Sequence, residues 1–268
     1  MNQPTAAVGP TRVALVTGAA RGIGAAVVRR LVAGGANVVA FDWCVGEDGP
    51  AGYAQATRAN LGALVAALPD GAVHPVVGDV RDAAALVDAV AEAVERWGRL
   101  DVAVAAAAVV GGGVPLWEDD SLDLLWDIDV RGVWNTAAAT VPAMLAGPDP
   151  SGCRFVALAS SAGERGLFHL AAYSAAKHAV VGLVRGLAAD LVGTGVTAVA
   201  VSPGSTGTDM LAATARLYGV TTRELAAHQL LRRALTPDEV AAAVALACSR
   251  DGAALNGSVI NADGGFTG

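Results

Sequence analysis

Two residues that could carry proton chemistry, Tyr173 and Lys177, lie four positions apart in the chain. On a helix, positions i and i+4 share one face, so the phenol and the ammonium would point into one site. A nearby cation stabilises a phenolate and lowers the tyrosine pKa toward working pH, as general acid–base catalysis requires. The bare spacing also occurs on ordinary helix surfaces. Here it includes the single lysine among 18 lysine and arginine residues, which favours Tyr173 as the acid/base.

A serine precedes this pair at the end of a predicted strand. Ser160 lies 13 residues before Tyr173, where its hydroxyl could polarise a substrate oxygen. Ser161 is the nearest alternative. The histidines and cysteines show neither metal-ligand spacing nor a CxxC pair, so no metal site and no disulfide framework is expected.

A glycine-rich turn, TGAARGIG at residues 17–24, follows the first predicted strand and opens a predicted helix. Glycines there let a pyrophosphate approach backbone N–H groups, and the helix N-terminus adds a favourable dipole. The spacing is GxxxGxG instead of the commoner GxGxxG, and such turns also occur for purely structural reasons. The strand–turn–helix context favours a nucleotide site. Its candidate contacts are Gly18, Arg21, Gly22, Ile23 and Gly24.

An acidic residue, Asp42, ends the second predicted strand 18 residues past Gly24. A carboxylate at this place bonds the adenosine ribose hydroxyls and repels a 2′-phosphate, so the expected cofactor is NAD in preference to NADP. Two alternatives stay open. Asp42 could be a simple turn residue, and Arg21 could meet a 2′-phosphate.

Short Val- and Ala-rich runs alternate with longer helical patterns along the chain. Continuously apolar strands that alternate with helices fit a parallel sheet covered on both faces. The sequence predicts an α/β fold: a flexible leader over 1–11, then a single doubly wound Rossmann-type domain over 12–268 with a mostly parallel, seven-stranded sheet. The expected strands are 13–16, 37–41, 74–78, 102–106, 154–159, 197–201 and 258–261. The expected helices are 23–33, 58–67, 83–97, 122–145, 172–191 and 237–248.

Composition excludes several classes of protein. The net charge is −7, and no basic cluster exceeds Arg232–Arg233, which argues against nucleic acid as a partner. Although 54% of the residues are hydrophobic, no apolar run reaches the ~18–20 residues that span a bilayer. The polar N-terminus lacks an apolar signal core. A cytoplasmic protein is therefore expected.

Two long segments follow strand ends, where open α/β sheets bind ligands. Residues 43–56 form an apparent insertion rich in Gly, Pro and acidic residues after Asp42. Residues 208–235 are rich in Leu and Ala and are expected to form an apolar lid over a hydrophobic pocket. The expected pocket residues of this lid are Leu211, Leu217, Tyr218, Leu225, Leu230 and Leu231.

Together these motifs resemble the short-chain dehydrogenase/reductase family. The resemblance rests on TGxxxGIG, Asp42, Gly78-Asp79-Val80, Ser160, YxxxK, Pro203-Gly204 and the terminal Asp263-Gly264-Gly265, and it covers Arg12 to Gly265. It implies that Tyr173 is the acid/base, that Ser160 stabilises the substrate oxygen, and that Lys177 binds the nicotinamide ribose while tuning Tyr173. It also implies further cofactor contacts at Asp79, Val80, Ala105, Pro203, Gly204, Thr206 and Thr208.

The chain departs from the family pattern in two places. Where the family usually has NNAG, residues 105–108 are all alanine, which removes hydrogen bonds that tie strand and cofactor together. Where the family places an asparagine in its catalytic proton relay, this chain has Asp129. An ionised aspartate can accept from water or pair with Lys177, but it cannot donate.

The insertion is similar to that of the mycofactocin-coupled branch of the family. That resemblance implies a tightly held NAD that a mycofactocin redox carrier reoxidises in place, and the family implies a homotetramer built on the helices at 122–145 and 237–248 or their neighbours. The expected reaction interconverts a small hydrophobic alcohol and its carbonyl. Two alternatives stay open: a freely exchanging dehydrogenase or ketoacyl-type reductase, and a non-catalytic nucleotide-binding protein.

Overall fold

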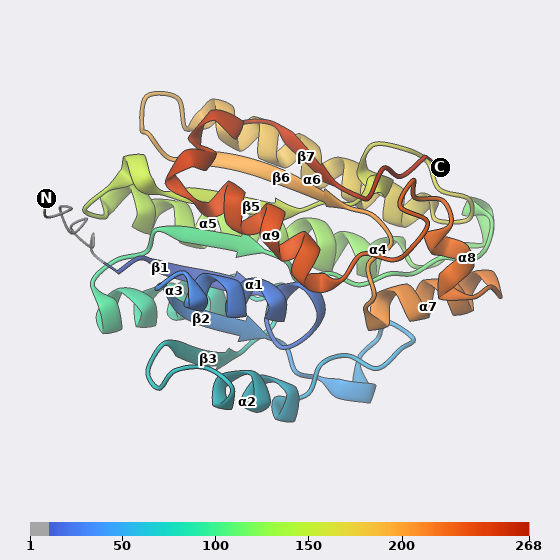
Figure 1. The fold of residues 1–268 in the computed structure, drawn as a ribbon, viewed down its shortest axis with the longest axis horizontal. Helices are drawn as coiled ribbons and strands as arrows, with labels where there is room; N and C mark the ends of the chain where they lie inside the picture. Colours follow the sequence, from blue (N-terminus) through green and yellow to red (C-terminus); the bar gives the residue numbers. More distant parts are fainter. Residues whose placement is uncertain (1–10, 268) are drawn as a thin grey trace, which may run out of the picture.

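Seven parallel strands form one sheet in the order β3-β2-β1-β4-β5-β6-β7 (Figure 1). The computed structural model describes residues 11–267, so residues 1–10 of the expected leader lie outside the described residues. The order reverses between β1 and β4, which is the arrangement of a doubly wound fold. The predicted α/β class and the seven-stranded parallel sheet are confirmed. The strands are β1 (Val13–Thr17), β2 (Asn37–Asp42), β3 (Val73–Val77), β4 (Val102–Ala105), β5 (Arg154–Leu158), β6 (Thr197–Pro203) and β7 (Val259–Ala262).

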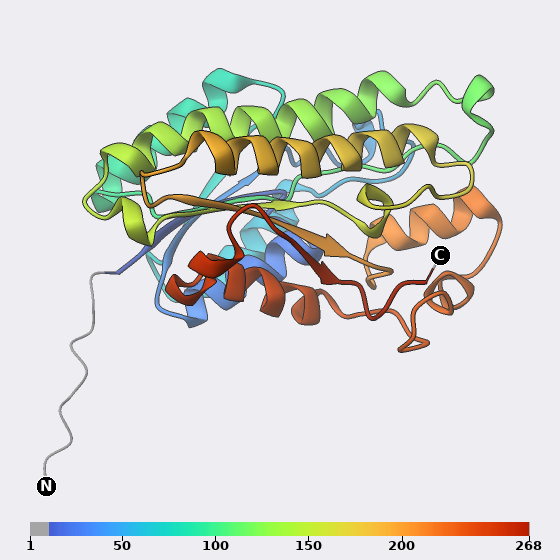
Figure 2. The ribbon, with the colours of Figure 1, turned by 90° about the horizontal axis from the view of Figure 1, so that it is seen from above.

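Helices cover both faces of this sheet, as Figure 2 shows. On one face lie α1 (Gly22–Ala33), α2 (Arg58–Ala66) and α9 (Pro237–Cys248). On the other lie α3 (Ala83–Trp97), α5 (Gly132–Ala146) and α6 (Ala171–Asp190). Among the described residues, no helix is both long enough and apolar enough to cross a membrane.

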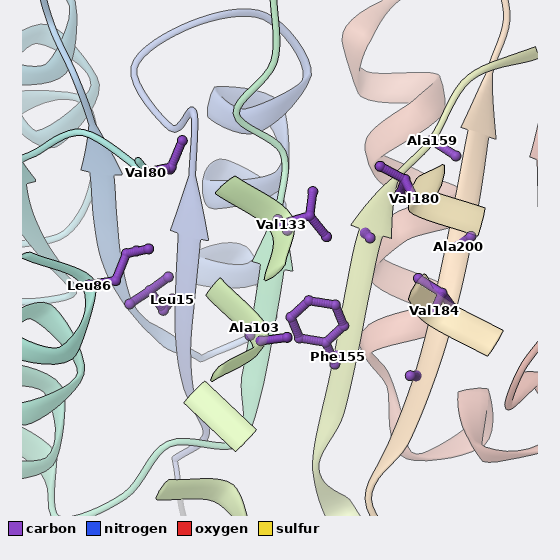
Figure 3. Close-up of a cluster of buried hydrophobic side chains, with 14 of the residues drawn as sticks. Leu15, Val80, Leu86, Ala103, Val133, Phe155, Ala159, Val180, Val184 and Ala200 are labelled. Carbon is purple, nitrogen blue, oxygen red and sulfur yellow. The ribbon is translucent and has the colours of Figure 1, made fainter. Parts of the chain in front are cut away.

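The sheet is buried on both sides because its strands are apolar at nearly every position. Successive side chains of a strand point to opposite faces, so each strand contributes to two separate cores. In the core shown in Figure 3, sheet residues Leu15, Ala103 and Phe155 pack with helix residues such as Val133 and Val184. Because the strands are packed on both faces, their carboxyl ends are held rigidly, and the residues that line the cavity follow these ends.

The helix predicted over 122–145 is present as one helical run, but the hydrogen bonding in its middle changes to the π-helical type. A short α4 (Leu122–Leu125) passes into a π-helical segment, Trp126–Arg131, before α5 begins. A π-helical turn inserts an extra residue into a helix and is often found at functional sites. Here it carries Asp129 into the interior, where its side chain is fully buried.

The two long segments lie together at the carboxyl edge of the sheet (Figure 1). Residues 43–56 form a closed loop, in which the N–H groups of Gly46 and Gln55 donate to Ala56 and Gly46. Residues 208–235 contain two helices, α7 (Asp209–Tyr218) and α8 (Thr222–Ala226). The insertion and the lid therefore both face the strand ends where a ligand would bind.

Candidate active site

A cavity of about 1160 Å³ opens along the carboxyl ends of the strands. The glycine turn, the Ser160 turn, α6, the insertion and the lid all contribute to its wall. Its volume exceeds the ~300–1,000 Å³ of typical small-molecule sites, so it has room for a large ligand. In the part of the chain that the structure describes, no group of three His, Cys, Asp or Glu residues could hold a metal ion.

The glycine turn lacks side chains where the backbone is most crowded. Gly18 has φ +64°, and a Cβ there would lie 2.8 Å from the backbone of Ala107. A Cβ on Gly24 would collide with the carbonyl oxygen of Gly18. All five predicted contacts of this turn line the cavity, at the N-terminus of α1. This open helix end can receive a phosphate group.

The carboxylate of Asp42 lies beside the glycine turn, as predicted. Its Oδ2 accepts from the N–H of Ala20 at 2.9 Å, and its Oδ1 accepts from the N–H of Cys44 at 3.0 Å. Asp42 is buried by these contacts and still lines the cavity. Its charge would lie where a 2′-phosphate would have to sit.

Arg21 also lines the cavity, but its guanidinium binds across to the insertion and the lid. Nη1 donates to the carbonyl of Ala54 at 2.7 Å and to Asp209 Oδ2 at 2.9 Å, and Nη2 donates to Gln55 Oε1 at 3.1 Å. The open alternative, in which Arg21 meets a 2′-phosphate, gains no support from this arrangement. The side chain instead joins three segments that are distant in sequence.

Ala105, a predicted cofactor contact, does not line the cavity. Ala105 belongs to β4 and faces the core formed with α3 and α5, while the cavity is lined by the next three alanines, 106–108. Although the alanines 106–108 have no side-chain hydrogen bonds, this segment is still bonded to β1 through its backbone. The hydroxyl oxygen of Thr17 accepts from the N–H groups of Ala106 and Ala107 at 3.1 and 3.2 Å, so β1 still holds this segment.

Asp79, Val80 and the loop after β6 complete the predicted nucleotide wall. Asp79 and Val80 both line the cavity, and Arg81 Nη2 donates to Asp79 Oδ2 at 2.5 Å. The guanidinium of Arg81 also lies 4.5 Å from the ring centre of Trp43, in the insertion. After β6, the predicted contacts that line the cavity are Pro203, Gly204, Thr206 and Thr208.

The predicted proton-transfer residues come together on and beside α6. Tyr173 and Lys177 lie one helical turn apart, and Lys177 Nζ is 5.6 Å from the centre of the Tyr173 ring. Ser160 follows β5, and its side chain slightly offsets the raised pKa of the Tyr173 phenol. Ser160, Tyr173 and Lys177 all line the cavity. Ser161 lines it too, but only Ser160 affects the phenol.

Asp129 pairs directly with Lys177. Lys177 Nζ lies 3.1 Å from Asp129 Oδ2, and it donates weakly to the carbonyl of Leu158 at 3.4 Å. The other carboxylate oxygen, Oδ1, accepts from the N–H of Val109 at 2.9 Å. Of the two options that the sequence left for Asp129, the structure contains the ion pair.

This pairing changes the electrostatics of the phenol. Burial lowers the pKa of Lys177, but Asp129 and Tyr173 together outweigh burial and the net shift is upward. Burial raises the pKa of Tyr173, Asp129 adds to the rise, and Lys177 opposes it without reversing it. The sequence led us to expect a lowered tyrosine pKa. In the cavity the shift is upward, chiefly because the phenol is buried, and Asp129 adds to the rise while Lys177 only partly offsets it.

The substrate end of the cavity is apolar and reaches the lid. The Sδ atom of Met210, on α7, lies 3.9 Å from the Tyr173 hydroxyl oxygen. Of the residues predicted for the lid, Leu211, Tyr218 and Leu225 line the cavity, Leu217 packs on Gly113, and Leu230 and Leu231 are largely exposed. The apolar side chains that line this end are Val109, Val110, Leu167, Phe168, Leu170, Met210, Leu211, Tyr218, Val220, Leu225 and Phe266.

Several cavity residues were not predicted from the sequence. Tyr53 and Trp43 enter from the insertion, Met210 from α7 and Phe266 from the C-terminal segment. Phe266 is carried there by pairing with the lid, since Leu230 donates to the carbonyl of Gly265 at 2.9 Å. For Tyr53 and Trp43, the sequence offered one signal: they are aromatic residues within an otherwise polar insertion.

Comparison with known proteins finds relatives along nearly the whole chain. The sequence model of a family described as enoyl-(acyl carrier protein) reductase matches residues 18–267. An uncharacterized NAD-dependent oxidoreductase of Mycobacterium tuberculosis is 36% identical over 266 residues, covering 95% of each chain. A (-)-trans-carveol dehydrogenase of Rhodococcus erythropolis is 38% identical over 186 residues, which are 67% of this chain and 65% of that one.

A solved structure extends the similarity to the whole fold. Carveol dehydrogenase from Mycobacterium avium, in complex with NAD, superposes with a TM-score of 0.88 at 29% identity, covering 96% of this chain and 98% of that one. The chain therefore belongs to the short-chain dehydrogenase/reductase family of oxidoreductases.

Proposed function

We propose that this chain interconverts a hydrophobic alcohol and its carbonyl, with NAD as the cofactor and Tyr173 as the acid/base. The observation that carries the proposal is the position of the Tyr173 hydroxyl. It lies between Ser160 and Met210, where the nucleotide part of the cavity meets its apolar end. The names of the relatives, which include carveol dehydrogenases, support an alcohol as substrate.

The described residues fit NAD. Gly18 and Gly24 leave the cradle at the start of α1 that a pyrophosphate needs. Asp42 offers a carboxylate for ribose hydroxyls and repels an added phosphate. When bound, NAD would accept or supply the hydride, and the protein contributes position and electrostatics.

The side chains around Tyr173 divide the proton chemistry. Tyr173 removes a proton from the alcohol oxygen, or returns one to the carbonyl oxygen. Ser160 donates a hydrogen bond to that oxygen and holds it near the phenol. Lys177 binds the nicotinamide ribose, and Asp129 fixes the Lys177 ammonium through the 3.1 Å pair. Because an ionised carboxylate cannot donate, a relay past Lys177 would use water that donates to Asp129.

We further propose that the insertion holds NAD tightly and that an external redox carrier of the mycofactocin type reoxidises it in place. Arg21 supports this by tying residues 54 and 55 of the insertion to the glycine turn. The test is to desalt the purified protein, denature it and identify released nucleotide by mass spectrometry. Near-stoichiometric NAD or NADH, with turnover of carveol that needs a dye acceptor, is expected. An empty protein that turns over with added NAD would show ordinary exchange.

A homotetramer is the proposed assembly. Apolar side chains are exposed along α4 and the helical segments that follow it, including Leu122, Trp126 and Trp134, the last with 64% of its surface exposed. Exposed aromatic residues in one patch mark association surfaces. Light scattering on a sizing column should give four chains, and a single chain would contradict the proposal.

A further inference from the structure

The insertion contributes a phenol whose hydroxyl has no visible partner. Tyr53 lines the cavity, and its hydroxyl oxygen is buried without a hydrogen bond to any described residue. Buried hydroxyl groups in proteins are nearly always hydrogen-bonded, and leaving one unpaired costs about 1–3 kcal/mol. An unpaired hydroxyl that faces a ligand cavity points to a partner on the ligand.

The surrounding contacts fix the position of this phenol. Gln55 Nε2 donates to the carbonyl oxygen of Tyr53 at 2.9 Å, and Gln55 is itself held by Arg21. The guanidinium of Arg21 lies 5.7 Å from the centre of the Tyr53 ring. Through Gln55 and Arg21, the Tyr53 ring is therefore held in place against the glycine turn.

The phenol lies beside the glycine turn, close to the guanidinium of Arg21, in the wall of the cavity that Gly18 and Gly22 also line. Burial raises the pKa of Tyr53 to about 12 despite Gln55 and Arg21. Tyr53 is therefore a neutral hydrogen-bond donor at physiological pH.

We propose that Tyr53 donates a hydrogen bond to an oxygen of the central part of NAD, either the pyrophosphate or the ribose on its nicotinamide side. The inference rests on the proposed function, since it requires NAD in this cavity. It makes the insertion part of the cofactor site itself, with a side chain that contacts the ligand. Charge-assisted bonds to phosphate oxygens are the stronger kind.

The test measures cofactor release from the intact protein. Wild type, Tyr53→Phe and Glu47→Gln are loaded with NADH and mixed with excess NAD, and the fluorescence of bound NADH is followed. Tyr53→Phe removes one oxygen and keeps the ring packing. Glu47→Gln alters an exposed residue of the same insertion. We expect NADH to leave Tyr53→Phe about tenfold faster than wild type, and Glu47→Gln to match wild type.

The affinities of two fragments of NAD show which part of the cofactor Tyr53 contacts. ADP-ribose should bind Tyr53→Phe about tenfold more weakly than wild type, whereas AMP should bind both equally. Equal NADH release from Tyr53→Phe and wild type would overturn the role of Tyr53 and leave the proposed function standing. An equal loss of AMP affinity would overturn its central placement. A wild-type protein that neither retains nucleotide through purification nor binds added NADH would contradict the proposed function and this inference with it.

Discussion

Lys177 Nζ lies 3.1 Å from Asp129 Oδ2, and the two side chains are almost completely buried. The family resemblance leads one to expect a neutral asparagine in the place of Asp129. A carboxylate there cancels the lysine charge beside the catalytic phenol. Burial is the main cause of the raised pKa of Tyr173, Asp129 adds to the rise, and Lys177 offsets it only in part.

Asp129→Asn should shift the pH dependence of alcohol oxidation. The substitution leaves the Lys177 charge unbalanced, which stabilises the phenolate and lowers the pKa of Tyr173. Oxidation needs the phenolate as base, so its rate rises with pH through that pKa. We expect the rising limb of kcat to move about one pH unit lower.

Asp129→Glu is the matched control, because it keeps the charge near Lys177. A pH profile that stays unchanged in Asp129→Asn while the protein remains folded would show that the pair does not tune Tyr173. Thermal unfolding of both variants checks the fold.

The fold could be predicted from the sequence because its signals are local. Apolar runs, glycine turns and helix periodicity each lie within a short stretch, and all seven strands were found within one or two residues of their bounds. Tyr173 and Lys177 were predicted together because four residues make one helical turn. Ala105 faces the core and Ala106 lines the cavity, because successive side chains of a strand point to opposite faces.

The contacts between distant segments could not be predicted in this way. Arg21 bonds Ala54 and Asp209, which lie 33 and 188 residues away. Nothing in the spacing of these residues indicates that they meet. Tyr53 and Met210 reach the cavity for the same reason: their segments fold back over it.

Removing the side chain of Arg21 should loosen the insertion. In Arg21→Met, residues 54 and 55 lose hydrogen bonds that hold them to the glycine turn, each worth about 1 kcal/mol. Backbone hydrogen exchange in residues 43–56 should become about tenfold faster. Asp209→Asn should change it less than twofold, because the Asp209 side chain is 69% exposed and exposed ion pairs contribute little. Equal effects of the two variants would refute this division of roles.

Met210 should control which alcohols fit above Tyr173. Met210→Ala removes the side chain whose sulfur lies 3.9 Å from the Tyr173 hydroxyl oxygen. We expect kcat/KM for carveol to fall about tenfold, since a lost apolar contact of this size is worth 1–3 kcal/mol. A bulkier alicyclic alcohol should lose less or gain. Met210→Leu, which conserves volume, should behave like wild type, and an unchanged ratio between the two alcohols in Met210→Ala would contradict the assignment.

The most direct test of the account compares Tyr173→Phe with wild type for oxidation of carveol and related alicyclic alcohols, with added NAD and with a dye acceptor. The substitution removes only the hydroxyl that moves the proton. We predict that kcat falls about a thousandfold, while NADH binding stays within about twofold because Tyr173 is not needed to hold the nucleotide. A Tyr173→Phe protein that oxidises these alcohols at the wild-type rate would contradict the central claim.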